Sequence, residues 1–158
     1  NGTTNGTNIN VRSGPSTSKK RLTTLGINKS VTITGMSGSW YKISIKIKGK
    51  KKTGYIKKTY VTVIGKPTVT ASASSNSKIK LKWNKISGAS GYLVQRYNSS
   101  KKKYATIKTI KKGSTVSYTN SGLRKNTTYK YRIRAYKTVR GRKIYSSYSS
   151  AKSAKTKK

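Results

Sequence analysis

The sequence predicts an all-β protein built from two small domains. Three observations indicate this fold class. Apolar and polar residues alternate in several short segments, Thr, Val and Ile are enriched, and glycines recur at intervals too short for long helices. Because successive side chains of a strand point to opposite faces, such alternation is typical of strands with one buried and one solvated face.

Three segments show the alternation most clearly. Their apolar positions are Ile43, Ile45 and Ile47, then Ile79, Leu81 and Trp83, and finally Tyr129, Tyr131, Ile133 and Ala135. Lys, Arg and Ser occupy the positions between them. We expect these polar residues on the solvated face, where the aliphatic stems of the cations also cover apolar surface.

A domain boundary is expected at Gly65-Lys66-Pro67. Proline cannot donate to a sheet ladder, so it ends one set of strands before the next begins. The predicted domains are 1–65, with its core in 8–64, and 66–158, with its core in 67–156. Both ends of the chain are polar or basic, and we expect them to be frayed.

The composition removes most kinds of chemistry. The 158 residues include 38 Lys and Arg but no Asp, Glu, His or Cys, which gives a formal net charge of +38. Without carboxylates, imidazoles or thiols, the chain lacks the usual catalytic acids and bases and the usual metal ligands. We therefore expect no enzyme activity, no metal, no cofactor and no disulfide. There is also no run of 18 apolar residues, so no transmembrane segment is expected.

Four sequence blocks characterise the first half. They are Ile-Asn-Val-Arg-Ser-Gly-Pro-Ser-Thr-Ser at 9–18, Trp-Tyr-Lys-Ile at 40–43, Thr-Gly-Tyr-Ile at 53–56 and Tyr-Val at 60–61. In this order they resemble a bacterial SH3 (SH3b) domain over residues 8–64. The resemblance implies a small SH3-like barrel that binds cell-wall peptidoglycan.

Six residues of this half are candidates for a ligand groove, with structural roles as the alternative for each. Trp40, Tyr41, Tyr55 and Tyr60 either line a groove or pack the barrel, while Asn10 and Arg12 either hold a ligand or bond the backbone of the nearby turn. The candidates are thus Asn10, Arg12, Trp40, Tyr41, Tyr55 and Tyr60.

The second half carries Leu-Lys-Trp-Asn at 81–84, Gly-Tyr-Leu-Val at 91–94, and Leu123 followed by Tyr129. Together these resemble a fibronectin type III domain, an immunoglobulin-like β-sandwich, over residues 66–156. The resemblance implies that Trp83 is a core residue. It also implies that Tyr129 forms a tyrosine corner, with its hydroxyl bonded to the backbone near Leu123.

Basic clusters occur in both halves, and no counter-charge exists on the chain. Self-repulsion then opposes folding, and an anionic partner would relieve it. We expect a broad electrostatic coating and not one shaped pocket. The polyanion-binding candidates are Lys50, Lys51, Lys52, Lys57, Lys58, Lys101, Lys102, Lys103, Arg132, Arg134, Arg140 and Arg142.

These observations predict a secreted or surface-attached module pair of a Gram-positive-like bacterium. It would bind peptidoglycan through the barrel and anionic polymers such as teichoic acid through its lysines. One alternative is a structural subunit or spacer of an extracellular assembly, held by self-association or by an anionic protein partner. Non-specific nucleic-acid binding is another. The missing carboxylates also fit deliberate supercharging or an artefact of sequence assignment, since Asn84, Asn120 and Asn126 stand where an acid would be unremarkable.

Overall fold

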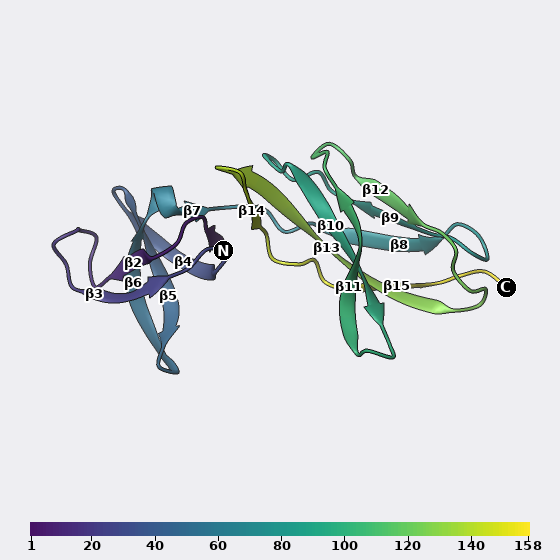
Figure 1. The fold of residues 1–158 in the computed structure, drawn as a ribbon, viewed down its shortest axis with the longest axis horizontal. Helices are drawn as coiled ribbons and strands as arrows, with labels where there is room; N and C mark the ends of the chain where they lie inside the picture. The colour runs from purple at the N-terminus through teal and green to yellow at the C-terminus, as the bar shows by residue number, and fades with distance from the viewer. The chain divides into compact units, whose positions relative to one another are not determined.

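The computed structural model describes residues 1–158 and confirms the all-β prediction (Figure 1). The chain divides into two compact units. The first contains Asn1–Ile64 with Thr138–Ser146, and the second contains Gly65–Lys137 with Ser147–Lys158. None of the chain's helices is long and apolar enough to cross a membrane.

The first unit contains a seven-stranded antiparallel sheet in the order β3-β2-β6-β5-β4-β1-β7. A short 3-10 turn at Lys58–Tyr60 precedes its last strand. The strands are β1 (Gly2–Thr4), β2 (Ile9–Arg12), β3 (Arg21–Leu25), β4 (Ser30–Ser37), β5 (Trp40–Ile47), β6 (Lys50–Lys57) and β7 (Val61–Thr62).

The core of this unit consists of β-branched residues, one or two from each contributing strand. Its buried members are Ile9, Val11, Val31, Ile43, Ile56 and Val61. The alternation predicted for 43–47 is only partly matched, because Ile43 is buried whereas Ile45 and Ile47 are half-buried. Their partners on β6 are Lys52 and Lys50, which are exposed, so these two isoleucines are less covered than Ile43, although Ile45 still packs against the core.

Lys48 and Gly49 join β5 to β6, and both have positive φ angles, of 48° and 75°. A two-residue turn with two positive φ angles matches the right-handed twist of a hairpin, and glycine adopts it without steric cost. This turn fixes the register in which Trp40 lies opposite Lys57 and Ile43 lies opposite Gly54.

The expectation of frayed ends is wrong. The first strand, β1, lies between β4 and β7, and Thr4 is fully buried, with its hydroxyl donating to the Gly26 carbonyl at 2.6 Å. At the other end Thr156 is also buried and donates to the Arg124 carbonyl at 2.7 Å. Backbone pairing and short hydroxyl bonds therefore order segments whose composition resembles that of loose tails.

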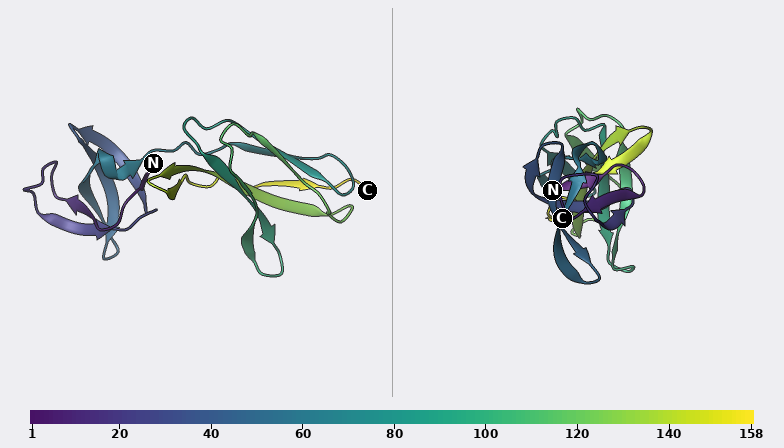
Figure 2. Two further views of the ribbon diagram at one scale, coloured as in Figure 1. Left: turned by 45° about the horizontal axis from the view of Figure 1, so that its top comes forward. Right: turned by 90° about the vertical axis from the view of Figure 1, so that its left-hand side faces the viewer.

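The second unit is a sandwich of two antiparallel sheets. One sheet has the order β12-β9-β8, and the other has the order β11-β10-β13-β14 with β15 paired to β13. The strands of these sheets are β8 (Val69–Ala73), β9 (Ile79–Trp83), β10 (Gly91–Asn98), β11 (Lys103–Ile110), β12 (Ser117–Asn120), β13 (Thr128–Val139), β14 (Arg142–Tyr145) and β15 (Lys152–Lys155). Of these, β14 and the last two residues of β13 belong to the Thr138–Ser146 segment, which is part of the first unit. The turn between β10 and β11 projects from the sandwich (Figure 2).

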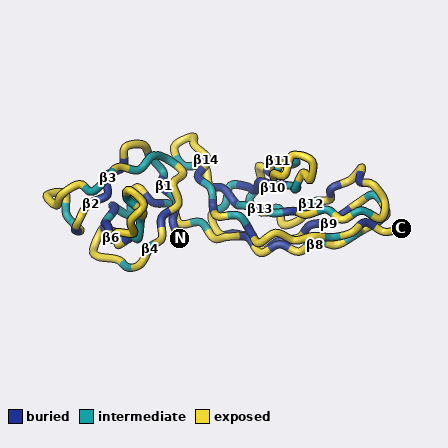
Figure 3. Tube along the Cα trace, turned by 90° about the horizontal axis from the view of Figure 1, so that it is seen from below, coloured by how far each residue is buried: buried dark blue, intermediate teal, exposed yellow.

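Buried residues lie along the strands of this unit, and exposed residues fill the turns (Figure 3). Ile79, Leu81 and Trp83 are all buried, as their alternation predicts, and the Trp83 ring lies 5.3 Å from that of Tyr92. The predicted tyrosine corner is confirmed, because the Arg124 amide donates to the Tyr129 hydroxyl at 2.9 Å.

Gly91, at the start of β10, is needed for close packing. A Cβ at this position would collide with the Ile110 carbonyl oxygen and with the Tyr136 ring. We predict that Gly91→Ala lowers the free energy of unfolding by about 3 kcal/mol, as overpacking against backbone does. Gly26→Ala is the matched control, since no atom lies within 4 Å of the added Cβ. Denaturant unfolding of both variants tests this, and equal midpoints would contradict it.

Candidate functional site

A groove of about 190 Å³ opens on the first unit between the start of β2, the start of β5 and the 3-10 turn. It brings together four of the six predicted groove residues, namely Asn10, Arg12, Trp40 and Tyr60. The full lining is Thr7, Asn8, Ile9, Asn10, Arg12, Thr17, Trp40, Lys57 and Tyr60. Tyr41 and Tyr55 are not part of it.

The two aromatic residues of the groove differ in exposure. Trp40 begins β5 and is only 7% exposed, with the Lys57 ammonium 5.8 Å from its ring centroid. Tyr60 stands on the 3-10 turn and is 43% exposed. Trp40 is therefore mainly a packing residue that forms part of the wall, and Tyr60 presents the accessible ring.

Arg12 has the structural role considered as its alternative. Its guanidinium donates to the Lys19 carbonyl at 2.8 Å and so ties the loop after β2 back to the strand. Asn10 lies two residues earlier on β2, on the same face, and is half-buried in the groove. Its amide can donate to a ligand carbonyl and accept from a ligand N–H.

Tyr41 and Tyr55 lie outside the groove, within the sheet of the first unit. Tyr41 packs against the barrel core, and the Lys58 ammonium lies 5.6 Å from its ring centroid. Tyr55 is half-buried in β6, where it is paired with Arg12 on β2 and with Lys42 on β5.

The groove therefore offers an exposed aromatic ring, two amides, hydroxyls and two cations. This set suits the amides and hydroxyls of a peptide or glycan, with Lys57 able to attract a carboxylate. No residue of the chain can supply a carboxylate, imidazole or thiol to it.

The polyanion candidates fall into three structural groups. Those on the β6 end, on the β10–β11 turn and around the β13–β14 turn are exposed, namely Lys50, Lys51, Lys52, Lys101, Lys102, Lys103, Arg140 and Arg142. Lys57 and Lys58 are half-buried against aromatic rings. Arg132 and Arg134 are half-buried in β13.

Arg132 is held in a stack that sequence reasoning missed. Its guanidinium carbon lies 4.0 Å from the Tyr104 ring centroid and 3.9 Å from that of Tyr148, and its Nε donates to Gln95 at 2.8 Å. Arg134 lies 4.6 Å from the same Tyr148 ring. Aromatic faces attract cations, so these rings do here what carboxylates do in most proteins. The signal for this stack is the β10–β13 register, which pairs Gln95 with Arg132 and which the sequence pattern does not specify.

Inside the sandwich, the side-chain oxygen of Asn120 is another neutral group that accepts a hydrogen bond from an arginine. The Tyr131 hydroxyl donates to Asn120 Oδ1 at 3.0 Å, and Arg96 Nη1 donates to the same oxygen at 3.3 Å. Tyr131 is fully buried, and burial raises its pKa to about 12. Desolvation penalises the tyrosinate form more than the nearby Arg96 charge stabilises it.

This raised pKa predicts a pH dependence of stability. The neutral phenol is favoured in the folded state, so its contribution is complete below pH 10 and is lost as the pH rises from 10 to about 12. Lysines titrate in the same range, so Tyr131→Phe is the reference. We expect the stability difference between wild type and Tyr131→Phe to be constant below pH 10 and to shrink above it. Denaturant unfolding across this range tests it, and parallel pH curves would contradict it.

Comparisons with known protein families identify the two domains that the sequence motifs resemble, in the same order along the chain. The family model described as bacterial SH3 domain matches residues 7–62, and the one described as fibronectin type III domain matches residues 65–151. No curated protein matches.

Solved structures with fibronectin type III folds are also similar. The "Structure of FN3tt mut" is 20% identical, with a TM-score of 0.50 over 61% of this chain and 100% of that one. An Fn3-like protein from Clostridium thermocellum is 30% identical, with a TM-score of 0.46 over 58% of this chain and 92% of that one.

Proposed function

We propose that this chain, which belongs to the fibronectin type III family and carries a bacterial SH3 domain before it, binds the bacterial cell envelope. Both kinds of domain are typically non-catalytic binding or structural modules. The barrel would contact peptidoglycan, and the lysine-rich surface would contact anionic polymers such as teichoic acid. The protein would act outside the cell, either secreted or at the cell surface.

The observation that carries the peptidoglycan part is the groove on the barrel. It gathers Asn10, Trp40 and Tyr60 from separate segments of the chain, next to the Lys57 cation. Peptidoglycan combines amides, sugar hydroxyls and carboxylates, and each of these has a complementary group in the groove.

The charge supports the polymer part. With a net charge of +38, the chain has no acidic side chain that could neutralise its exposed lysines. Lysine contacts phosphate as a point charge without fixed geometry, so its flexible side chain suits a flexible polyphosphate. The exposed groups on β6 and on the β10–β11 turn are the most accessible of these contacts.

Tyr60 is the residue whose loss should separate groove binding from charge. We predict that Tyr60→Ala weakens binding to purified peptidoglycan by about tenfold, the effect of truncating an aromatic anchor. Val63→Ala is the control, because Val63 is 58% exposed and is not part of the groove lining. Co-sedimentation with sacculi stripped of teichoic acid measures both variants. Wild-type affinity in Tyr60→Ala would refute the groove assignment.

Salt dependence tests the polymer part. We predict that binding to complete walls weakens sharply between about 50 and 500 mM salt, because the reach of exposed charges falls to about 10 Å at 0.1 M and shortens further above it. Binding to stripped sacculi should change less over the same range. Salt-insensitive binding to complete walls would remove the electrostatic part of the proposal.

A further inference from the structure

The second unit contains a cationic cavity of about 390 Å³ that the proposed function does not use. It lies beside the β10–β11 turn and the start of β13. Arg96, Arg124 and Tyr129 contribute to its lining together with Ser99, Ser100 and Thr127. A cavity of this volume is within the size range of small-ligand sites, about 300–1,000 Å³.

Arg96 is fixed in position within this cavity. Its Nη1 donates to Asn120 Oδ1 at 3.3 Å, and its guanidinium carbon lies 5.4 Å from the Tyr129 ring centroid. A guanidinium has five N–H donors, and the bond to Asn120 uses one of them. Because the side chain is already ordered, less conformational entropy is lost when it binds an anion.

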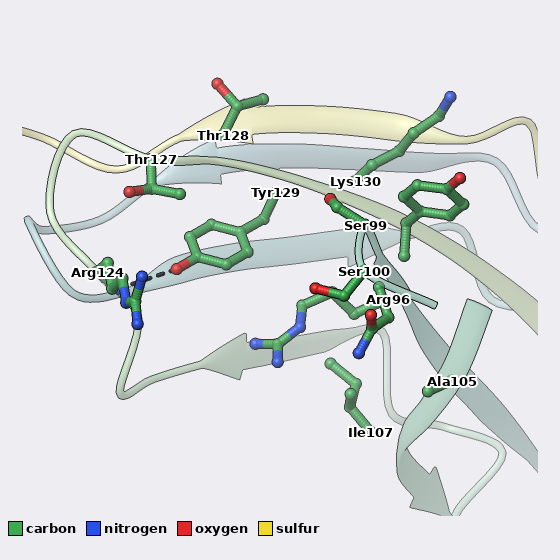
Figure 4. A pocket seen from close by; sticks show the side chains of 12 residues that line it. Arg96, Ser99, Ser100, Ala105, Ile107, Arg124, Thr127, Thr128, Tyr129 and Lys130 are labelled. Atoms are coloured by element: carbon green, nitrogen blue, oxygen red, sulfur yellow. Dashed lines mark hydrogen bonds between the residues drawn. The ribbon is translucent and has the colours of Figure 1, made fainter. Parts of the chain in front are cut away.

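The backbone of Arg124 is also held in place by hydrogen bonds. Its amide donates to the Tyr129 hydroxyl at 2.9 Å, and its carbonyl accepts from Thr156 at 2.7 Å. Figure 4 shows Arg96 and Arg124 beside the Tyr129 ring, whereas the Lys130 ammonium points away from them. The two arginines are therefore the cations that can contact a ligand in this cavity, and Lys130 is not one of them.

Hydroxyl groups complete the site. Ser99 and Ser100 stand on a turn that is closed by the Lys101 amide, which donates to Asn98 Oδ1 at 2.9 Å. Ser100 lines the same cavity as Arg96 and Tyr129 (Figure 4). A hydroxyl can donate to a phosphate oxygen and accept from an alcohol, so this side of the cavity suits a ligand that carries both.

We propose that this cavity binds one phosphodiester-linked polyol unit of an anionic polymer. Two arginine forks match the several oxygens of a phosphate better than lysines do, and only 8 of the 38 cations are arginines. Nucleic acid is disfavoured because single strands bind by stacking on free aromatic faces, and Arg96 already lies against Tyr129. The choice of polymer rests on the proposed function, but the site itself does not.

The test uses a change that conserves charge. Arg96→Lys/Arg124→Lys keeps the net charge at +38 and removes both guanidinium forks. Arg21→Lys is the control, because Arg21 is exposed on β3 and lines neither this cavity nor the groove on the barrel. The probe is a short glycerol phosphate oligomer, compared with polyglutamate of equal charge. Binding is measured by calorimetry at about 0.3 M salt, where the attraction of surface lysines is strongly screened.

We expect wild type and the control to prefer the phosphate oligomer, and the Arg96→Lys/Arg124→Lys protein to bind it about tenfold more weakly with unchanged polyglutamate binding. An equal loss in Arg21→Lys, or no loss in either variant, would overturn the proposal. Tighter binding of single-stranded DNA with the same number of phosphates would also overturn it.

A second measurement does not depend on the variants being folded. In wild type, glycerol phosphate should shift the NMR signals of the Arg96 and Arg124 side-chain Nε–H groups before those of Arg140 and Arg142. Uniform shifts of all four would indicate only a diffuse charge effect and would overturn the site. None of these probes contains peptidoglycan, so failure here leaves the groove on the barrel to be judged by Tyr60→Ala alone.

Discussion

No basic side chain of this protein can pair with an acidic side chain, because the chain contains no Asp or Glu. Cations near the interior are accordingly held by rings and neutral oxygens. Arg132 lies between two tyrosine rings, Arg96 shares the Asn120 oxygen with Tyr131, and Lys57 lies over Trp40. A neutral acceptor binds a cation less strongly than a carboxylate does, but its own burial costs far less free energy. This constraint determines which cations can be partly buried at all.

The same constraint governs the surface. Most lysines stand on exposed strand faces and turns, where water and counterions stabilise them, and their mutual repulsion acts against the compact state. The two apolar cores therefore have to supply the stability. They do so with β-branched residues in the barrel and with the Trp83–Tyr92 pair and its neighbours in the sandwich. A polyanion that bound to this surface would neutralise the lysines and so relieve their repulsion.

Recognition and attraction thus reside in different features. The groove on the barrel has a single exposed ring, Tyr60, and two cations, Arg12 and Lys57, of which Arg12 is already bonded to the loop after β2, so its selectivity comes mainly from shape, amide and hydroxyl groups. The cavity in the sandwich has two arginines, of which Arg96 is held by Asn120, so its selectivity comes from guanidinium geometry. The exposed lysines have neither property. They can raise the affinity of any anionic surface and the rate of association with it, while the two sites discriminate among ligands.

By itself the sequence determined the fold class, the order of the two domains and the tyrosine corner. Alternation is a local feature that backbone geometry converts directly into strands, and the tyrosine corner was implied by the resemblance to fibronectin type III domains at Leu123 and Tyr129. Only the tertiary structure decided that Tyr60 lines the groove and Tyr41 does not, and that Arg132 lies between Tyr104 and Tyr148. These outcomes depend on strand order and register between distant segments, and many cations and tyrosines compete for each contact. A pattern within one strand carries no information about which of them meet.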